Sequence, residues 1–168
     1  EGVRHGLTAE VVPPVIVDGE RVSSTRIRAL VAGGLLEDAA VLLGRPYAIA
    51  GTVARGRGMG KQLGYPTANL QSDRALLPAH GIYAARVTID GADRLAAVNI
   101  GFAPTLPHER PVVEAHLLDY AGELAGRRIE IRLYQRLRGE EKFNGISELK
   151  AAIERDIVAI RRYFAEGA

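Results

Sequence analysis

The segment from Gly56 to Lys61 is the first part of the chain whose residue types could bind phosphate. It reads Gly-Arg-Gly-Met-Gly-Lys, so Gly56, Gly58 and Gly60 alternate with other residues before Lys61. Alternating glycines let the backbone approach a phosphate closely, and successive N–H groups can surround an anion. The segment is not a Walker A loop, because the first required glycine is missing and Gln62 replaces Ser or Thr. Taken alone, it is more typical of a flexible hairpin loop.

A second candidate pair, Thr67 and Asn69, follows a Gly-Tyr-Pro sequence. In an extended segment, residues two apart face the same side, so the Thr67 hydroxyl and the Asn69 amide would project together. Two neutral oxygen ligands suit Mg²⁺, which keeps several waters and takes further ligands from substrate phosphates. The alternative is a turn that starts at Pro66, with Asn69 as an ordinary turn residue. In isolation, the turn is the better interpretation.

Glu114 is a candidate for acid–base chemistry. It shares one face of a predicted strand with His116, while the apolar neighbours Val113, Ala115 and Leu117 share the other. A carboxylate in a mostly apolar strand is costly unless it is paired or functional, so Glu114 could be a general base for an attacking hydroxyl. The alternative is an ordinary solvent-facing glutamate. The histidines at positions 5, 80, 108 and 116 have no metal-ligand spacing, so we interpret them as incidental.

Short strand patterns occupy the part of the chain that carries these residues. Residues 82–89 alternate between apolar and polar, and Asp90-Gly91 marks a turn to the next strand. Six strands joined by turns predict a closed antiparallel barrel or a sandwich. We expect the strands at residues 47–54, 63–70, 82–89, 95–100, 112–118 and 129–137.

The C-terminal end of the chain has the pattern of a helix. A stripe of Leu149, Ile153, Ile157, Ile160 and Phe164 predicts one amphipathic helix that packs on the barrel. The residue at position 147, a serine, is its predicted N-cap.

Residues 1–44 differ from the rest of the chain. The Pro-interrupted apolar run at 11–17 is interpreted as an edge strand before the turn at Asp18-Gly19. The three hydroxyl residues at positions 23–25 offer N-caps for a helix, and a second short helix is expected at about 35–43, ending at Gly44. Too few apolar residues lie here for a separate core. We therefore expect residues 1–44 to be the tail of a larger domain and residues 45–168 to form the main domain.

Composition limits the classes of function. The chain has 168 residues, 47% of them hydrophobic, and no run approaches the 18 apolar residues of a membrane span. It has no cysteine, which excludes disulfides and thiolate metal sites and fits a reducing cytoplasm. The formal net charge is only +2, and no basic run is interleaved with aromatics, which argues against nucleic acid as a partner. We therefore expect a cytoplasmic protein that binds small molecules rather than nucleic acid or membranes. The start at Glu1 indicates a fragment or a processed product.

Taken in order, the motifs resemble those of the riboflavin kinase family, over about residues 47–164. The N-terminal sequence DGERVSSTRIR at 18–28 is similar to the last nucleotidyltransferase motif of bacterial enzymes that fuse riboflavin kinase to FMN adenylyltransferase. The kinase-like segments are GTV at 51–53, GMGKQLGYPTANL at 58–70, PAHGIY at 78–83, NIGFAPT at 99–105, VEAHLLD at 113–119 and LRGEEKF at 137–143.

The resemblance implies a six-stranded antiparallel Greek-key barrel with a C-terminal packing helix and a short α-helical N-terminal segment. It also implies transfer of the γ-phosphoryl group of Mg·ATP to the ribityl 5′-hydroxyl of riboflavin, which gives FMN and ADP. A flap around residues 105–110 would close over the substrates. The implied roles are ATP phosphate binding for Gly56, Gly58, Gly60 and Lys61, contact with Mg²⁺ and phosphate for Thr67 and Asn69, base catalysis for Glu114, and flavin binding for Arg138, Glu141 and Phe143.

The N-terminal resemblance assigns Ser23, Ser24, Thr25 and Arg28 to phosphate contacts during adenylylation. The H-x-G-H motif that opens such a domain is absent from this sequence. We therefore expect no FMN adenylyltransferase activity from this chain, although a longer parent protein would also convert FMN to FAD.

Three positions depart from the family pattern. Ala125 stands where tyrosine is usual, Ala103 where arginine is usual and Leu106 where phenylalanine is usual. These departures concern a barrel corner and the flap rather than the phosphate chemistry.

Two other functions remain open from the residues alone. A small barrel could hold a phosphate-bearing ligand without turnover, or it could bind nucleic acid. The near-neutral net charge argues against the second. Glu114 together with Thr67 and Asn69 favours an enzyme over the first, because binding alone needs no base.

Overall fold

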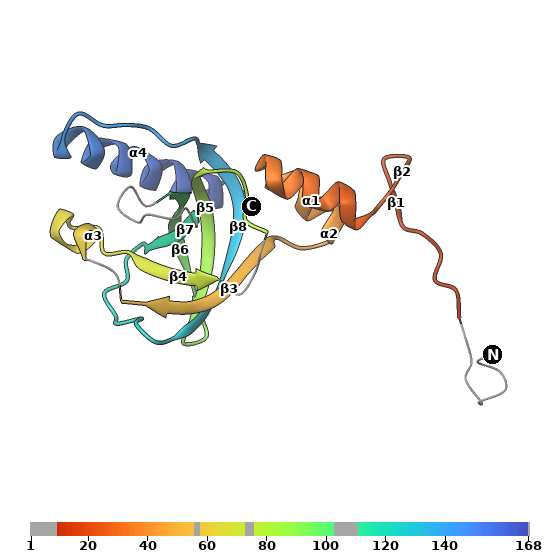
Figure 1. Ribbon diagram of the computed structural model, residues 1–168, viewed down its shortest axis with the longest axis horizontal. Coiled ribbons are helices and arrows are strands. Elements are labelled where there is room, and N and C mark those ends of the chain that lie inside the picture. Colours follow the sequence, from red (N-terminus) through yellow and green to blue (C-terminus); the bar gives the residue numbers. More distant parts are fainter. Residues whose placement is uncertain (1–9, 56–57, 73–75, 103–110, 168) are drawn as a thin grey trace.

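A closed six-stranded antiparallel barrel forms the centre of the molecule (Figure 1). The computed structural model describes residues 10–55, 58–72, 76–102 and 111–167. Neighbouring strands follow the order β3-β4-β7-β6-β5-β8, so β7 and β8 lie on opposite walls. This confirms the predicted barrel and decides against a sandwich. The strands are β3 (Tyr47–Ala54), β4 (Ala68–Ser72), β5 (Gly81–Ile89), β6 (Ala92–Phe102), β7 (Pro111–Leu117) and β8 (Arg128–Arg138).

Alternating side chains fill the barrel. On β5, the side chains of Tyr83, Val87 and Ile89 are buried. They belong to one hydrophobic cluster that also contains residues from each of the five remaining barrel strands. Since successive strand residues face opposite sides, the same alternation places polar residues on the outer wall. The turn between β5 and β6 is formed by Asp90 and Gly91, which have φ values of 52° and 78°. Both values are positive, as a tight two-residue hairpin turn requires, so the sequence signal was correct.

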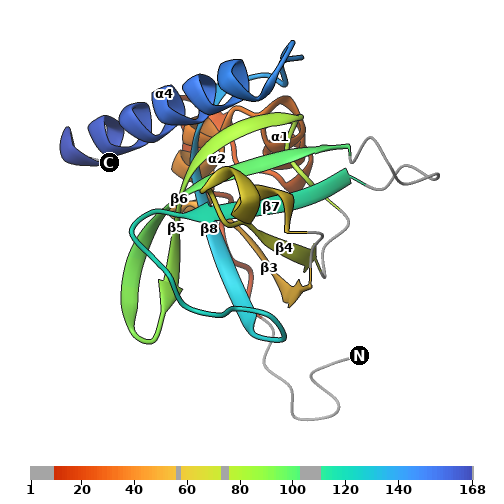
Figure 2. The same cartoon turned by 90° about the vertical axis from the view of Figure 1, so that its left-hand side faces the viewer.

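Helix α4 (Ile146–Ala165) lies across the outer side of β5 and β6 (Figure 2). Ile160 is buried there against Ala84 and Leu118 in a second hydrophobic cluster. The predicted stripe of apolar residues is therefore correct, but the predicted N-cap is wrong. The cap is Gly145, and the position predicted as cap lies inside the first turn. Glu148 instead accepts a hydrogen bond from the Asn144 backbone N–H at 2.8 Å, which satisfies a donor just outside the helix start.

The N-terminal segment forms a small hairpin and two helices. Strands β1 (Ile16–Val17) and β2 (Glu20–Arg21) pair with each other, and helices α1 (Ser24–Gly33) and α2 (Leu36–Leu43) follow. The strand predicted at 11–17 is shorter than expected, because the two prolines before it lack the N–H that a ladder needs. The two predicted helices are present.

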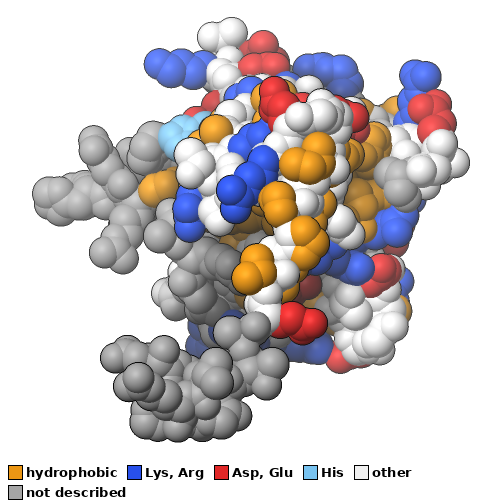
Figure 3. All heavy atoms as spheres, turned by 90° about the vertical axis from the view of Figure 1, so that its right-hand side faces the viewer, with side chains coloured by type: hydrophobic (Ala, Val, Ile, Leu, Met, Phe, Trp, Pro, Cys, Tyr) orange, Lys and Arg blue, Asp and Glu red, His pale blue; other side chains and the backbone are white. Residues whose placement is uncertain are grey.

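The helices α1 and α2 share the barrel core. Val31, Leu36 and Ala39 belong to the same hydrophobic cluster as the barrel interior, and α2 contacts β8 and β3. Apolar side chains also reach the surface at this end of the molecule (Figure 3). Leu35 and Val41 are more than half exposed there. The division of the chain after residue 44 stays a prediction.

One short helix was not predicted. Helix α3 (Met59–Leu63) occupies part of the Gly-rich stretch and the start of the segment expected to be extended at 63–70. Gly58 precedes it with a φ of 73°, and Gly64 ends it with a φ of 92°. These left-handed conformations suit glycine, so two of the glycines bound a helical turn rather than an open loop.

Candidate functional site

Three polar side chains form a row across three neighbouring strands on the outer wall. Asn69 of β4 is directly opposite Glu114 of β7, and Glu114 is directly opposite Asn99 of β6. All three are partly exposed, while the residues on either side of each are buried in the barrel. Side chains that are directly opposite each other have Cβ atoms about 5 Å apart. The structure therefore brings together the predicted base and one predicted metal ligand, on the outside of the wall.

Glu114 has no counter-charge within the described part of the chain. Neither an ion pair nor a side-chain hydrogen bond joins it to another described residue. Within the described part of the chain, the partly exposed carboxylate is therefore available to accept a proton or a hydrogen bond from a ligand. This is the arrangement that a general base requires, since a base that is already paired is less available.

Thr67 lies one residue before β4, against helix α3. A Cβ placed on Gly60 would lie 3.1 Å from the Thr67 Oγ1 and 2.4 Å from the Tyr65 carbonyl oxygen. Glycine at position 60 is therefore required for α3 to sit this close to the segment before β4. Lys61, the predicted phosphate ligand, is exposed in the last turn of α3. Gly58, Gly60 and Lys61 lie a few residues before Thr67 in the sequence. In space, the structure shows close approach to Thr67 for Gly60.

His116 is a residue whose contacts the sequence interpretation missed. It faces outward on β7, two positions after Glu114, and its Nδ1 lies 2.9 Å from the Pro66 carbonyl oxygen. Its ring also meets the Tyr65 ring edge-on, with 5.6 Å between centroids. The signal was present in the sequence, because His116 shares the face of Glu114, but nothing in the spacing indicated which residue it would contact.

The three predicted flavin-binding residues lie together at the end of β8. The Arg138 guanidinium is 3.8 Å from a Glu141 carboxylate oxygen and 5.8 Å from the centre of the Phe143 ring. Arg138 also donates two hydrogen bonds, of 2.9 Å and 2.8 Å, to the buried carboxylate of Asp156 on α4. These bonds raise the pKa of Arg138 and fix its orientation.

The flavin-binding candidates are linked to the polar row through the register of β5. Ile82 of β5 pairs with both Asn99 and Arg138, so the row of Glu114 continues around the barrel to the end of β8. Traced the other way, from Glu114 through Asn69 to Ala54, the same row reaches β8 near its start, because the register of a closed barrel is staggered. The register therefore connects Glu114 with Arg138 without placing them at one height, and the two lie on opposite walls. Near the same end, the Glu140 carboxylate lies against the backbone of Gly101.

The residues assigned to an adenylyltransferase remnant lie elsewhere. Ser23 caps α1 and accepts a hydrogen bond from the Arg26 N–H at 3.2 Å, while Ser24 and Thr25 begin the helix and Arg28 is exposed on it. Helices α1 and α2 lie on the opposite side of the barrel from α3 (Figures 1 and 2). The structure therefore separates this group from the Glu114 row.

Some predicted features fall outside the described residues. These are the proposed phosphate ligand Gly56, the proposed flap at residues 105–110 and the departures at Ala103 and Leu106.

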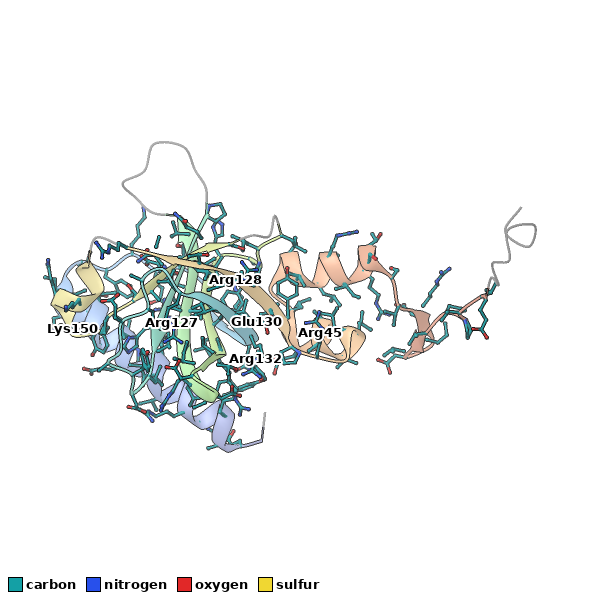
Figure 4. The ribbon with its side chains drawn as sticks, turned by 90° about the horizontal axis from the view of Figure 1, so that it is seen from below. Arg45, Arg127, Arg128, Glu130, Arg132 and Lys150 are labelled. Atoms are coloured by element: carbon teal, nitrogen blue, oxygen red, sulfur yellow. The ribbon has the colours of Figure 1, made fainter. Side chains whose placement is uncertain are left out.

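The outer wall of β8 carries charged residues of both signs, including Arg128, Glu130 and Arg132 (Figure 4). Arg132 donates to the Asp93 carboxylate at 2.6 Å, and nearby Arg127 donates to Asp90 at 2.6 Å. The Arg127 hydrogen bond lowers the pKa of Asp90. Arg132 and Arg127 are thus matched by carboxylates, whereas Glu130, like Glu114, is in none of the ion pairs among the described residues.

The donor atoms near Glu114 suit a magnesium ion that arrives with a nucleotide. The described residues contain no group of three or more His, Cys, Asp or Glu side chains that could hold a metal by themselves. Mg²⁺ does not need such a group, because it is commonly held by one or two protein ligands together with waters and substrate phosphates. The Asn69 amide oxygen and the Thr67 hydroxyl are hard oxygen donors of the required kind.

No helix among the described residues is long and apolar enough to cross a membrane.

The model of the flavokinase (riboflavin kinase) family matches residues 43–164. A bifunctional riboflavin kinase/FMN adenylyltransferase of Pseudomonas fluorescens is 42% identical over 99% of this chain and 54% of its own length. The chain thus spans about half the length of the curated relatives it matches.

Solved structures share the fold. A crystal structure described as a macrolide-efflux protein from Streptococcus pneumoniae has a TM-score of 0.83 and is 32% identical. The match covers 89% of this chain and 50% of that chain. A riboflavin kinase from Trypanosoma brucei has a TM-score of 0.53 and is 20% identical, and the match covers 73% of this chain and 82% of that chain. At this identity the similarity is one of fold alone. With the family match across most of the barrel and α4, the chain belongs to the riboflavin kinase family.

Proposed function

We propose that this chain transfers the γ-phosphoryl group of Mg·ATP to the ribityl 5′-hydroxyl of riboflavin, giving FMN and ADP. The observation that carries the proposal is the pairing of Asn69 with Glu114 on the outer wall, where Glu114 has no counter-charge among the described residues. A carboxylate base next to a ligand of the nucleotide's metal is what transfer to an alcohol requires.

Glu114 would act on the acceptor. Its carboxylate accepts a hydrogen bond from the ribityl O–H, orients the oxygen toward the γ-phosphorus and takes the proton as the new O–P bond forms. The bond between the γ-phosphorus and the bridging oxygen breaks, and ADP leaves with the electron pair. Because phosphoryl transfer has a loose transition state, orientation contributes more than the strength of the base.

Thr67 and Asn69 would act on the donor. Their oxygens would hold Mg²⁺ and phosphate oxygens, and Lys61 with Gly56, Gly58 and Gly60 would contact the triphosphate. Bound Mg²⁺ supplies positive charge that offsets the charge developing on the phosphates. The arrangement supports this division of labour, since Asn69 and Glu114 face the same side of adjacent strands.

Arg138, Glu141 and Phe143 would bind the flavin. The support is their clustering at the end of β8. Phe143 would offer apolar surface to the isoalloxazine ring, while the Asp156 bonds would keep Arg138 in place. The phosphorylation takes place, on this proposal, in the cytoplasm. A longer parent protein would also adenylylate FMN, for which Ser23, Ser24, Thr25 and Arg28 would contribute phosphate contacts.

One incubation tests the activity. The protein is mixed with riboflavin, ATP and Mg²⁺, and the flavins are separated by chromatography. We expect FMN and no FAD, and no FMN when Mg²⁺ is removed by a chelator. Binding of flavin and nucleotide without any FMN would support a binding module and contradict the kinase.

A further inference from the structure

The residues before β4 are not held by the β4–β7 ladder. That ladder begins where Ala68 pairs with Ala115, so Thr67 precedes it. Pro66 has no N–H to donate, which removes one backbone hydrogen bond that could extend the ladder. Thr67 nevertheless has to keep a fixed position relative to Asn69 and Glu114 if all three serve one reaction. Some other contact must therefore fix the segment.

His116 makes that contact from β7. Its Nδ1 lies 2.9 Å from the Pro66 carbonyl oxygen. A carbonyl oxygen only accepts, so the hydrogen of this bond is on Nδ1 of the imidazole. In the antiparallel register, the position opposite Thr67 on β7 is His116, one step beyond the Ala68–Ala115 pair. The side chain thus replaces the missing backbone bond at the place where the ladder stops.

Two further contacts hold the same segment. The Tyr65 ring meets the His116 ring edge-on, and the Tyr65 hydroxyl donates to Glu154 of α4 at 3.1 Å. The Tyr65 backbone N–H donates to the Gly60 carbonyl of α3 at 2.8 Å. The segment is therefore bound from β7, α3 and α4. Only the His116 contact comes from the strand that also carries Glu114.

We propose that His116 is a positioning residue that sets Thr67 and Asn69 relative to Glu114, and so orients the Mg·nucleotide. The proposal rests on the proposed function. His116 and Glu114 are two residues apart on one face of a strand, so the bond to Pro66 fixes the nucleotide side of the site to the strand of the base. Loss of the bond should disturb the nucleotide and leave the flavin contacts at the end of β8 unchanged.

Three substitutions separate the hydrogen bond from the ring contact. His116→Asn keeps an N–H donor at the position of Nδ1 and loses the ring. His116→Phe keeps a ring against Tyr65 and loses the donor. His116→Ala loses both. Arg162→Ala, which removes an exposed ion pair with Glu166 far along α4, serves as the control. Melting temperatures identify any variant that does not fold, and the Asn and Phe pair carries the comparison if the Ala variant fails.

The measurements are Mg·ADP binding by titration calorimetry and the KM values for Mg·ATP and riboflavin. For His116→Phe and His116→Ala we expect Mg·ADP binding weaker by about five- to tenfold and a similar rise in the KM for Mg·ATP, the size of one lost hydrogen bond. We expect His116→Asn and the control to stay within about twofold of the unmodified protein, and the KM for riboflavin to change less than about twofold throughout.

Two outcomes overturn the proposal. One is an unchanged Mg·ADP affinity in His116→Phe, and the other is an Asn variant that binds as weakly as the Phe variant. A rise in the KM for riboflavin equal to that for Mg·ATP would also contradict it, because general loosening of the barrel would have that effect. Absence of FMN formation by the unmodified protein would instead overturn the proposed function, and the binding measurements would still decide on His116.

Discussion

The outer walls around β7 and β8 differ in which of their charged side chains are paired. On β8 and the adjoining turn, Arg132 is bonded to Asp93 and Arg127 to Asp90. On β7, Glu114 faces outward between two asparagines and has no counter-charge among the described residues. The two strands lie on opposite sides of one barrel. The comparison teaches that the lack of a partner does not by itself mark a functional carboxylate, because Glu130 on β8 is also in none of the ion pairs among the described residues. What distinguishes Glu114 is its position between Asn69 and Asn99.

The sharpest way to break this comparison is to neutralise one glutamate on each wall. Glu114→Gln removes the proposed base, and we expect the rate of FMN formation to fall about 10²- to 10⁴-fold. Mg·ADP binding should remain nearly intact. The matched control is Glu130→Gln, an exposed glutamate on the outer face of β8, which should stay within about twofold. Equal rates for the Glu114 variant and the unmodified protein would remove Glu114 from the mechanism.

Truncating the neutral oxygens next to Glu114 should have the next largest effect. Thr67→Ala and Asn69→Ala should each lower the rate about 10- to 100-fold and weaken Mg·ADP binding, because the metal aligns donor and acceptor. Thr52→Ala is the matched control, since Thr52 is exposed on β3 and pairs with Arg128. Calorimetry and initial rates measure both effects. Unchanged Mg·ADP affinity in both site variants would show that neither residue contacts the metal or the phosphates.

The Arg138–Asp156 pair tests whether matched charge contributes to stability where it is partly buried. Asp156→Ala leaves the Arg138 guanidinium, whose side chain is 20% exposed, without its bidentate partner. We expect unfolding to become easier by about 2 kcal/mol, as for hydrogen bonds to charged groups. Urea denaturation measures the change. Glu166→Ala, which breaks the exposed pair with Arg162, should change stability by less than about 0.5 kcal/mol, and equal effects would contradict the assignment.

The smallest expected effect concerns pH and the exposed charges near β8. A hydrogen bond from Thr88, with the nearby Arg132, lowers the pKa of Asp93 in the folded protein. A carboxylate with a lowered folded pKa adds stability above its unfolded pKa of about 3.9, and this stability is lost as the pH falls through the folded value. Asp93→Asn should therefore cost about 0.5 kcal/mol or less near pH 7, after screening. The difference should shrink toward pH 3 and in high salt, and a constant difference would contradict it.

Much of the fold could be read from local patterns. The alternation at residues 82–89 and the Asp90-Gly91 turn are local, and both were correct. Other boundaries depend on context. Helix α3 forms inside the Gly-rich stretch, and α4 starts two residues earlier than the serine at 147 would place it. Propensity is a weak guide where tertiary contacts decide the end of a helix.

The site was only partly readable. The shared facing of Glu114 and His116 follows from strand periodicity. That of Thr67 and Asn69 stays a prediction, because Thr67 lies before the start of β4. The contact of His116 with Pro66 does not follow from periodicity, because it joins residues 50 positions apart. The same holds for Asp156, whose burial beside Arg138 depends on where α4 packs against the barrel.

By itself the sequence determined the alternating strands, the amphipathic C-terminal helix and the residue types that could meet a phosphate, because these depend on neighbours along the chain. Only the tertiary structure decided that Asn69, Glu114 and Asn99 stand side by side, since strand order and register set which distant residues become neighbours. It also decided which charges are matched. A charged side chain is matched by the opposite charge that lies beside it in space, and in the pairs Arg132–Asp93 and Arg127–Asp90 that partner is far away in the sequence.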